Sequence, residues 1–564
     1  MAEYMDKWTS ATNPMFRSKF SEDIFNQKYK HDGCETWEEL CWTLVSDVMG
    51  NNASKSEKSE LARYMAELKF IPGGRYLYYA GRENKFFNNC FLLKAEEDNR
   101  EDWAELSKKV ELCLSTGGGI GVDYSIYRPS GSLLRGTGGM ASGPIPKMQM
   151  VNDQGRGIMQ GGSRRSAIYA SLNWKHDDIP QFLKAKDWYN VPVAGTNKSL
   201  GELREADFNF PVPLDYTNIS VNYDTDWIEE YWNDGEVGSV FRQNVKQALS
   251  TGEPGFSFNF WDKENETLRN ACTEVTSEDD SDVCNLGSIN IGRIDSITEF
   301  RDVVELATKF LICGTLVAKL PYERVREVRE KNRRLGLGLM GIHEWLIKKG
   351  NSYEVTPELH RWLTIYRGVS DSTSARYANE LSISRPVANR AIAPTGSIGI
   401  LAGTTTGIEP LFAAAYKRRY LKGAKWHYQY VIDGVAQEMS ESYGIDPGTL
   451  DTSMSLAATP EKRMAFQADI QDYVDMAISS TINLPKWGTE NNTEDQVDDF
   501  TTLLANYAHR LRGFTCYPDG SRGGQPLVSV DYKDAVKKLG EEFEEHVEVA
   551  DVCDITGRGG TCGA

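Results

Sequence analysis

Three side chains suited to thiol and acid–base chemistry stand at alternate positions in the segment Asn270-Ala271-Cys272-Thr273-Glu274. On an extended loop, such positions point to one side of the backbone, so one substrate could touch the amide, the thiol and the carboxylate. A thiol can undergo redox chemistry, and a positioned carboxylate can move protons. In isolation, the same motif also fits a buried cysteine between a surface asparagine and a surface glutamate.

The spacing of the cysteines narrows the chemistry that they can perform. Ten cysteines would suit a secreted disulfide scaffold only in a chain much shorter than these 564 residues. No Cys-x2-Cys pair occurs, which argues against a structural zinc site. In a reducing compartment, the cysteines are therefore expected to be core residues, metal ligands or redox catalysts.

A second segment, Ala393-Pro394-Thr395-Gly396-Ser397-Ile398-Gly399, has the composition of an anion site. Small residues that lead into a helix present backbone N–H groups, and the helix dipole favours negative charge there. A lone Pro-Thr-Gly-Ser motif, however, is usually only a turn.

Composition and charge exclude several classes of partner. The formal net charge of −18 argues against duplex DNA or an anionic membrane, because binding to phosphates needs a basic face. No basic segment followed by an apolar one opens the sequence, and apolar runs such as residues 411–416 are too short to span a bilayer. We therefore expect a soluble cytoplasmic protein that binds phosphates only at local sites.

The elements that must position these residues alternate between helices and short apolar segments. From about residue 70, glycine clusters break the apolar segments, which is typical of an α/β fold with ligand-binding loops at strand ends. Capping and periodicity predict helices after Thr36 and over residues 56–68, 103–114 and 301–320. Two further helical regions are expected, namely a pair over 324–349 joined at Gly336–Gly338, and much of 425–485.

In chain order, these motifs resemble the catalytic subunit of ribonucleotide reductase over roughly residues 70–530. The segments that carry the resemblance, besides that of Cys272, are Asn88-Asn89-Cys90-Phe91-Leu92-Leu93, residues 115–132, 135–139 and 160–167, and Val283-Cys284-Asn285-Leu286-Gly287-Ser288-Ile289-Asn290. The resemblance implies a ten-stranded α/β barrel with Cys272 on a central finger loop. It divides the chain into a helical N-terminal region (1–70), a barrel domain with effector-specificity loops (71–545) and a flexible cysteine tail (546–564).

The resemblance also implies a role for each candidate residue. Cys272 would become a transient thiyl radical, Glu274 would act as general base on the substrate 3′-hydroxyl, and Asn270 would hold Glu274 or the substrate hydroxyls. Cys90 and Cys284 would donate a proton and electrons and end as a disulfide. Substrate binding is expected at Asn89 and at the phosphate loop, which consists of Pro394, Thr395, Gly396, Ser397 and Ile398.

A regulatory site for a deoxynucleotide or ATP effector is implied as well. The residues expected there are Asp98, Arg135, Arg164 and Arg165. Arginines flanked by glycine suit nucleotide contacts, whereas Asp98 fits equally well as a solvated acid in an acidic run. The segment before residue 70 lacks the pattern of the ATP-binding cone of some relatives, so global regulation by ATP and dATP is not expected.

The tail places Cys553 and Cys562 where the family carries a cysteine pair that passes electrons from thioredoxin or glutaredoxin. Eight residues separate the two cysteines, more than the usual few. Two alternatives therefore stay open: the two cysteines pair with each other, or one takes part in electron transfer and the other does not.

The sequence contains no flavin or metal-cluster motif, so a cofactor or a partner must start the radical. Iron-dependent relatives receive it through two adjacent tyrosines, whereas the corresponding segment 513–527 holds the single Tyr517. This segment and Thr406-Gly407-Ile408-Glu409-Pro410 resemble the cobalamin-dependent branch, class II, which implies adenosylcobalamin. The alternative is the same reaction with a radical supplied by a separate ferritin-like metal subunit.

Other classes of protein fit less well. A glycyl-radical lyase would need a radical glycine in a C-terminal loop, where this chain has cysteines. An inactive nucleotide-binding paralogue would have lost Cys272, Glu274 or a redox cysteine, and a dithiol oxidoreductase would need Cys-x2-Cys. The sequence leaves open whether the substrate is a diphosphate or a triphosphate, and whether the protein is a monomer or a homodimer.

Overall fold

The computed structural model describes residues 13–136, 138–158, 166–207, 210–422, 425–489, 491–521 and 527–544. The effector candidates Arg164 and Arg165, and the tail cysteines Cys553 and Cys562, lie outside the described residues. Within the described ranges, no helix is long and apolar enough to cross a membrane.

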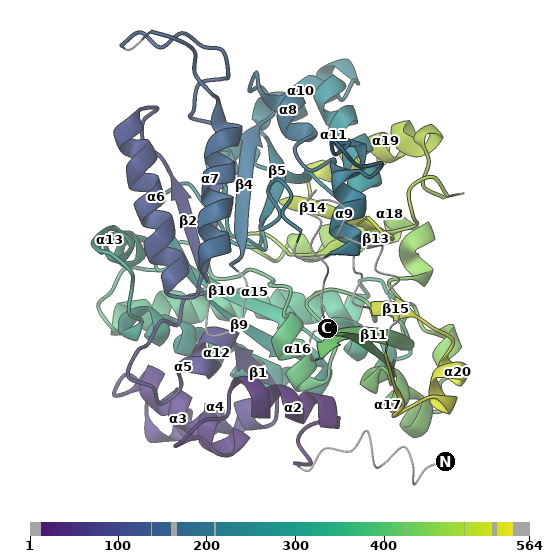
Figure 1. Cartoon of the computed structure of the whole chain (residues 1–564). Coiled ribbons are helices and arrows are strands. Elements are labelled where there is room, and N and C mark those ends of the chain that lie inside the picture. Colours follow the sequence, from purple (N-terminus) through teal and green to yellow (C-terminus); the bar gives the residue numbers. More distant parts are fainter. Residues whose placement is uncertain are drawn as a thin grey trace, which may run out of the picture.

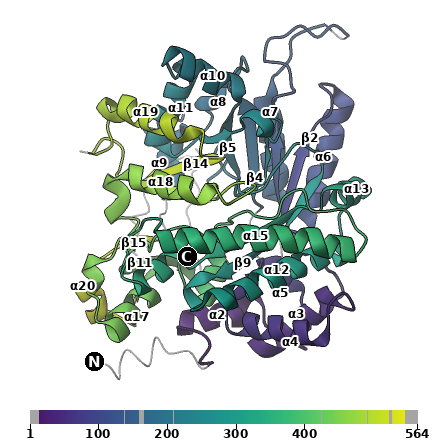
Figure 2. The same cartoon turned by 180° about the vertical axis from the view of Figure 1, so that it is seen from behind.

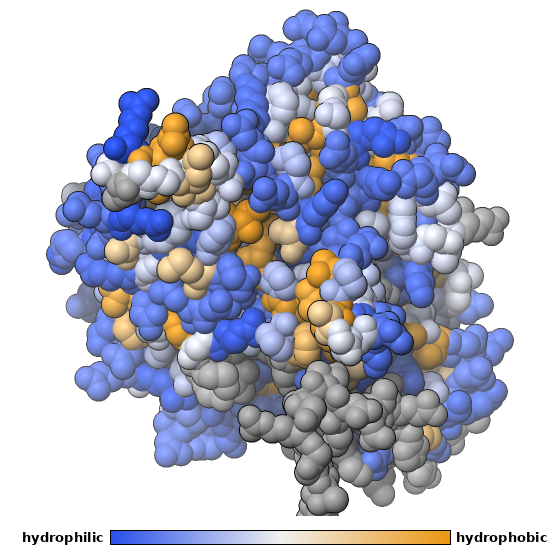
Figure 3. Space-filling model, turned by 45° about the horizontal axis from the view of Figure 1, so that its top comes forward, coloured by the Kyte–Doolittle hydropathy of each residue, from blue (hydrophilic) through white to orange (hydrophobic). Residues whose placement is uncertain are grey.

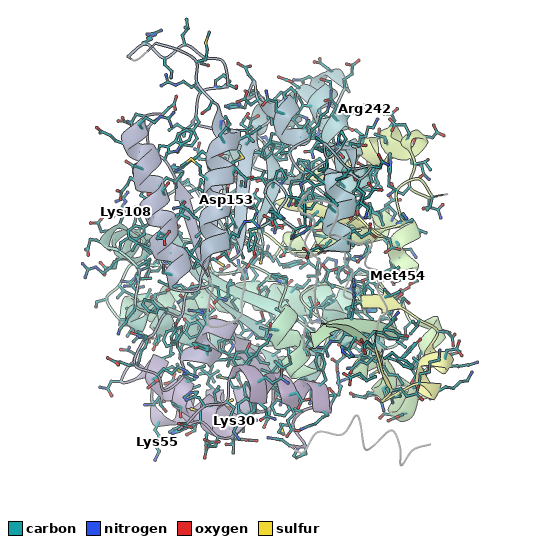
Figure 4. The ribbon with its side chains drawn as sticks, in the orientation of Figure 1. Lys30, Lys55, Lys108, Asp153, Arg242 and Met454 are labelled. Atoms are coloured by element: carbon teal, nitrogen blue, oxygen red, sulfur yellow. The ribbon has the colours of Figure 1, made fainter. Side chains whose placement is uncertain are left out.

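The surface matches the charged composition. On the face in Figure 3, hydrophilic residues predominate and the apolar patches among them are small and separate. Lys55, Lys108 and Arg242 lie at the periphery of the molecule (Figure 4). Lys55 and Lys108 are exposed, and Arg242 forms an ion pair with the exposed Asp498.

Five parallel strands form one half of the central sheet (Figure 1). Parallel strands are buried on both faces, so they read as nearly continuous apolar runs such as Phe91-Leu92-Leu93. The five strands are β2 Cys90–Lys94, β3 Gly119–Asp123, β4 Ile168–Asn173, β5 Thr217–Tyr223 and β6 Gly255–Phe258. Beyond β6 the sheet continues with β14 Gly513–Pro518, which is antiparallel to β6, and then with β13 Thr481–Leu484.

The other half is built around β9 Asp282–Asn290. This strand pairs antiparallel with β2 and with β1 Phe70–Pro72, and parallel with β10 Leu335–Met340. Together these elements make the ten strands of one sheet in the described part of the chain. The predicted strand number is therefore confirmed.

Two short segments close the sheet into a barrel. The Leu337 amide in β10 donates to the Asn389 carbonyl at 3.0 Å, and the Ile392 amide donates to the Ala477 carbonyl at 3.2 Å. Residues 388–392 thus pair with β10 on one side and with residues 476–479 on the other, and residues 476–479 lead into β13. This completes the ring of hydrogen-bonded segments. The expected α/β barrel is confirmed.

Helices cover the outside of the barrel. Long helices α12 Ile297–Val317 and α15 Pro357–Glu380 pack together on the β9 side, as Figure 2 shows from behind. They share one hydrophobic core with the N-terminal helices α3 Trp37–Met49 and α4 Lys55–Ala66. Capping boxes begin α3 and α4, at Thr36 with Glu39 and at Ser54 with Glu57, so these predicted helices are confirmed.

The remaining helices mostly flank the five parallel strands and the C-terminal region. The predicted helix over 103–114 is confirmed as α6 Arg100–Ser115. The others are α2 Lys19–Lys28, α5 Gly74–Tyr79, α7 Pro144–Gly157, α8 Ile179–Leu183, α9 Leu200–Ala206, α10 Thr225–Asp234, α11 Ser239–Thr251, α13 Glu323–Asn332, α14 Ile342–Lys348, α16 Gly396–Ala402, α17 Gly434–Tyr443, α18 Pro460–Gln471, α19 Val497–Ala508 and α20 Tyr532–Lys537.

The structure corrects two local predictions. Between α13 and α14, the expected helix junction at Gly336–Gly338 is instead the buried strand β10. A Cβ at Gly338 would lie 2.7 Å from the Ala391 carbonyl oxygen, so these glycines serve close strand packing rather than a turn. Residues 425–432 are likewise not helical but form β12, in a second sheet ordered β15 Leu527–Ser529, β11 Ala415–Lys422, β12 Lys425–Ile432 and β16 Glu542–Glu544.

Candidate active site

A short loop places Cys272 inside the barrel. The two-residue strands β7 Leu268–Arg269 and β8 Thr276–Ser277 pair with each other and hold residues 270–275 between them. At Gly121 of β3, a Cβ would lie 1.7 Å from the Arg269 carbonyl oxygen, so this strand position must be glycine for the loop to enter. The Asn218 amide group of β5 donates to the Ala271 carbonyl at 3.1 Å, which fixes the tip of the loop from one wall.

The opposite wall fixes the loop on its other side, because the Ala477 amide donates to the Glu274 carbonyl at 2.8 Å. The loop is not extended as the sequence suggested. The Thr273 amide bonds to the Asn270 carbonyl at 2.9 Å, and Thr273 has φ 71°, so the chain turns at this point. Nevertheless, Asn270, Cys272 and Glu274 all line one cavity, with Cys272 exposed and the other two buried.

Glu274 lies in an environment that favours its protonated form. Burial raises the pKa of its carboxyl to about 7, although hydrogen bonding from Asn270 acts in the opposite direction. Its Oε2 atom is buried without a hydrogen-bond partner in the described part of the chain. A carboxyl with a pKa near neutral pH can both accept and return a proton, as general acid–base catalysis requires.

Cys90 and Cys284 are directly opposite each other in the antiparallel pair of β2 and β9. Residues in such a register have Cβ atoms close enough for a disulfide to form with little backbone movement. The Asn270 amide group donates to Cys90 Sγ at 3.0 Å and so connects this thiol to the loop of Cys272. Burial raises the pKa of both Cys90 and Cys284 thiols, which keeps them protonated in the absence of substrate.

The phosphate loop reaches the same cavity. The residues that line this cavity include Asn89, Cys90 and the whole phosphate loop, which consists of Pro394, Thr395, Gly396, Ser397 and Ile398. Thr395 has φ 50°, and its Oγ1 accepts a hydrogen bond from the Gly407 amide at 2.8 Å. That bond ties the loop to the Thr406–Pro410 segment that the sequence singled out.

Two of the effector candidates lie within the described residues: Asp98 directly precedes the N-cap of α6, and Arg135 lies in the turn after Leu134. Asp98 accepts hydrogen bonds from the backbone and side chain of Arg128 and lines a small cavity with Trp103, Tyr127 and Leu134. Arg135 is an exposed residue in the turn that follows Leu134. Arg135 is therefore next in the chain to a residue that lines the cavity beside Asp98, while Arg164 and Arg165 lie outside the described residues.

Several residues that line the cavity were not predicted as site residues, and three of them come from the N-terminal part of the chain. Tyr29 comes from the end of α2, and Gly73 and Gly74 come from the start of α5. Glycine pairs are frequent in this chain, and a tyrosine in a polar helix carries no motif. Only the three-dimensional arrangement singles them out.

Comparison with known proteins places the fold and the site in a family. The family model described as "Ribonucleotide reductase, barrel domain" matches residues 88–198, 225–364 and 385–517, which is more than half of the chain. The chain belongs to the ribonucleotide reductase family. The resemblance expected from the sequence is confirmed, and the finger-loop and phosphate-loop residues lie within the matched ranges.

Named relatives of this ribonucleotide reductase chain include two vitamin B12-dependent ribonucleoside-diphosphate reductases. The Mycobacterium tuberculosis protein is 28% identical over 553 residues, which cover 89% of this chain and 78% of the relative. The Thermoplasma acidophilum protein is 28% identical over 517 residues, covering 82% of this chain and 65% of the relative. A ribonucleoside-diphosphate reductase subunit alpha of Chlamydia muridarum is 24% identical over 379 residues, covering 59% of this chain and 36% of the relative.

Among solved structures, the Actinobacillus ureae class Id ribonucleotide reductase alpha subunit superposes with a TM-score of 0.69. The match covers 89% of this chain and 96% of that chain at 16% sequence identity. At this identity the likeness supports the fold, and the chemistry must be argued from the site.

Proposed function

We propose that this chain reduces ribonucleoside di- or triphosphates to 2′-deoxyribonucleotides by thiyl-radical chemistry. The observation that carries the proposal is one cavity lined by Cys90, Asn270, Cys272 and Glu274 together with the phosphate loop 394–398. A nucleotide with its phosphates at this loop would place its ribose near the thiols and the carboxylate. This arrangement brings the thiols of Cys90 and Cys272 and the carboxyl of Glu274 to a single substrate, and Cys284 lies opposite Cys90 in the sheet.

The proposed steps use the residues in order. A thiyl radical at Cys272 takes the hydrogen atom from C3′, and Glu274 takes the proton of the 3′-hydroxyl. The 2′-hydroxyl leaves as water with one proton from the Cys90–Cys284 pair, and C2′ takes up the second thiol hydrogen. The two thiols thereby supply two electrons and become a disulfide. Cys272 then returns its hydrogen atom to C3′, and the proton on Glu274 returns to the 3′-oxygen. One oxygen leaves the substrate, and two thiols are oxidised.

Adenosylcobalamin is the proposed source of the radical, by analogy with the relatives named as vitamin B12-dependent. When bound, this cofactor supplies an organic radical that can take a hydrogen atom from a nearby thiol. The site fits such chemistry, because Cys272 is the exposed cysteine among those described. Strand β14 carries one tyrosine, Tyr517, rather than an adjacent pair. The residue before it is Cys516, whose Sγ donates to the Ala248 carbonyl at 3.4 Å.

Two partners complete the proposal. Thioredoxin or glutaredoxin would reduce the Cys90–Cys284 disulfide through Cys553 and Cys562 in the tail 546–564. A deoxynucleotide or ATP effector would bind near Asp98 and Arg135 together with Arg164 and Arg165. The cavity beside Asp98, which Arg100 and Arg128 also line, supports this placement.

The experiment that tests the function is anaerobic reduction of CDP and CTP by the purified chain with dithiothreitol. The reaction is run with and without adenosylcobalamin and without a second protein. Deoxycytidine product that requires the cobalamin is the expected result. A folded chain that binds nucleotide but gives no product with cobalamin, and gains activity only with a metal-containing subunit, would refute the proposed radical source.

A further inference from the structure

The N-terminal helix α2 is attached to the helix that follows the phosphate loop. Ser21 Oγ donates to the Ile400 carbonyl at 2.7 Å, and the Arg17 guanidinium donates to the Gly403 carbonyl. Both carbonyls lie at the C-terminal end of α16, where the last carbonyls of a helix lack partners within the helix. Helices α2 and α16 lie side by side (Figure 1), so α2 helps to position the phosphate loop.

A buried ion pair makes this attachment rigid. Arg17 contacts the Glu344 and Glu438 carboxylates, each at 2.6 Å, and the Glu344 side chain is fully buried. Removing either partner of a buried pair leaves an uncompensated charge, which strongly disfavours any movement that separates them. The start of α2 is therefore held on α14 and α17 as well as on the end of α16.

Tyr29 follows α2 directly and lines the substrate cavity, with its hydroxyl beside Gly74, which lines the same cavity. The residue is 5% exposed, and it lines the cavity together with Ser397 and Ile398. A Cβ at Gly74 would lie 3.1 Å from the Tyr29 hydroxyl oxygen, so the glycine at this position makes room for that hydroxyl. Tyr29 also lies outside the ranges that the family model matches.

We propose that Tyr29 is a substrate-positioning residue that donates a hydrogen bond to a phosphate oxygen of the bound ribonucleotide. The inference rests on the proposed function, because it assumes phosphates at residues 394–398. A phenol hydroxyl is a hydrogen-bond donor, and bonds to charged oxygens are stronger than those between neutral groups. The N-terminal region thus contributes directly to substrate binding, and its helix α2 holds both the phosphate loop and Tyr29 in place.

The first test measures binding of CDP and of cytidine to the full chain by equilibrium dialysis. Tyr29→Phe is expected to weaken CDP binding about tenfold or more and to leave cytidine binding unchanged. In turnover, KM for CDP rises while kcat stays within about twofold. Tyr64→Phe is the matched control, since Tyr64 is a buried tyrosine of α4 whose hydroxyl donates to Glu60 outside the cavity.

The second test uses Gly74→Ala in both backgrounds. With Tyr29 present, the new methyl group meets the hydroxyl at 3.1 Å, whereas the next nearest tyrosine atom, Cζ, lies at 3.9 Å. Gly74→Ala should therefore weaken CDP binding in the wild-type chain and have much less effect beside Tyr29→Phe. Equal effects in the two backgrounds would contradict a hydroxyl aimed at the ligand.

The outcomes separate this inference from the proposed function. A wild-type chain that binds no CDP counts against the proposed function. Normal CDP binding by Tyr29→Phe, or equal losses for CDP and cytidine, counts against Tyr29 as a phosphate contact. A fall in kcat with unchanged KM would also overturn the inference, because it would place the hydroxyl at the reacting ribose.

Discussion

Replacing Glu274 by glutamine is expected to stabilise the folded chain at alkaline pH while it abolishes turnover. The carboxyl is buried, and its Oε2 atom has no hydrogen-bond partner within the described ranges. Burial raises the pKa of Glu274 from 4.5 to about 7, although Asn270 opposes this change. The fold therefore holds a carboxylate in a place that disfavours its charge.

The sign and size follow from the two pKa values. Because the folded pKa lies above the unfolded one, the stability contributed by the protonated carboxyl is complete below pH 4.5 and is lost as the pH rises through 7. The difference, 7 − 4.5 = 2.5, corresponds to about 3 to 4 kcal/mol at roughly 1.4 kcal/mol per pH unit. About 2 kcal/mol of this develops between about pH 5.5 and about pH 8.5. Glutamine carries no charge and escapes the loss.

The assay is urea unfolding of the wild-type chain and of Glu274→Gln at these two pH values. The advantage of the variant in unfolding free energy should grow by about 2 kcal/mol from the lower to the higher pH. Glu266→Gln is the matched control: Glu266 is also largely buried, but Arg512 and its hydrogen bonds hold its pKa at about 2. Its effect should be the same at both pH values. If the effect of Glu274→Gln on the unfolding free energy does not change with pH, burial does not raise the pKa of Glu274.

Three further predictions follow from the proposed roles. Cys272→Ala should abolish turnover and leave CDP binding nearly intact in equilibrium dialysis; residual deoxycytidine formation would contradict the thiyl mechanism. Asn270→Ala should move the acidic limb of the kcat profile upward by about one pH unit, because a hydrogen bond that favours ionised Glu274 is lost; an unchanged limb would show that another group titrates. Cys553→Ala and Cys562→Ala should spare turnover with dithiothreitol and impair it with thioredoxin, whereas equal loss with both reductants would argue for a structural tail.

The sequence was most informative where chemistry needs particular residue types in order. Cys90, Cys272 and Cys284 could be chosen from ten cysteines because each stands in a family context, and that same context predicted the ten-stranded barrel. Periodicity alone led only to an α/β fold. It failed at Gly336–Gly338, because a buried strand flanked by helices lacks the alternating pattern that marks an exposed strand.

Tyr29 shows a different limit of the sequence. Its position depends on how α2 packs on α16, which is determined by the contacts of Arg17 and Ser21 with residues almost four hundred positions away. Local helix propensity contains no information about such a contact. The need for glycine at position 74 is likewise seen only from its distance to the Tyr29 hydroxyl in the structure. Long-range packing therefore decided the part of the site that no motif carries.

The closure of the barrel connects the fold to the chemistry. The segments 388–392 and 476–479 make only isolated bridges, yet they complete the ring of hydrogen bonds, and the Ala477 amide holds the Glu274 carbonyl. A barrel left open at this seam would admit water to Glu274, which would lower its pKa toward that of a free carboxyl and weaken it as a base. The same seam would then expose the radical at Cys272 to side reactions. Closing the barrel buries the Glu274 carboxylate, which lowers the stability of the fold. The same burial raises the pKa of Glu274 and so allows its proposed role as general base.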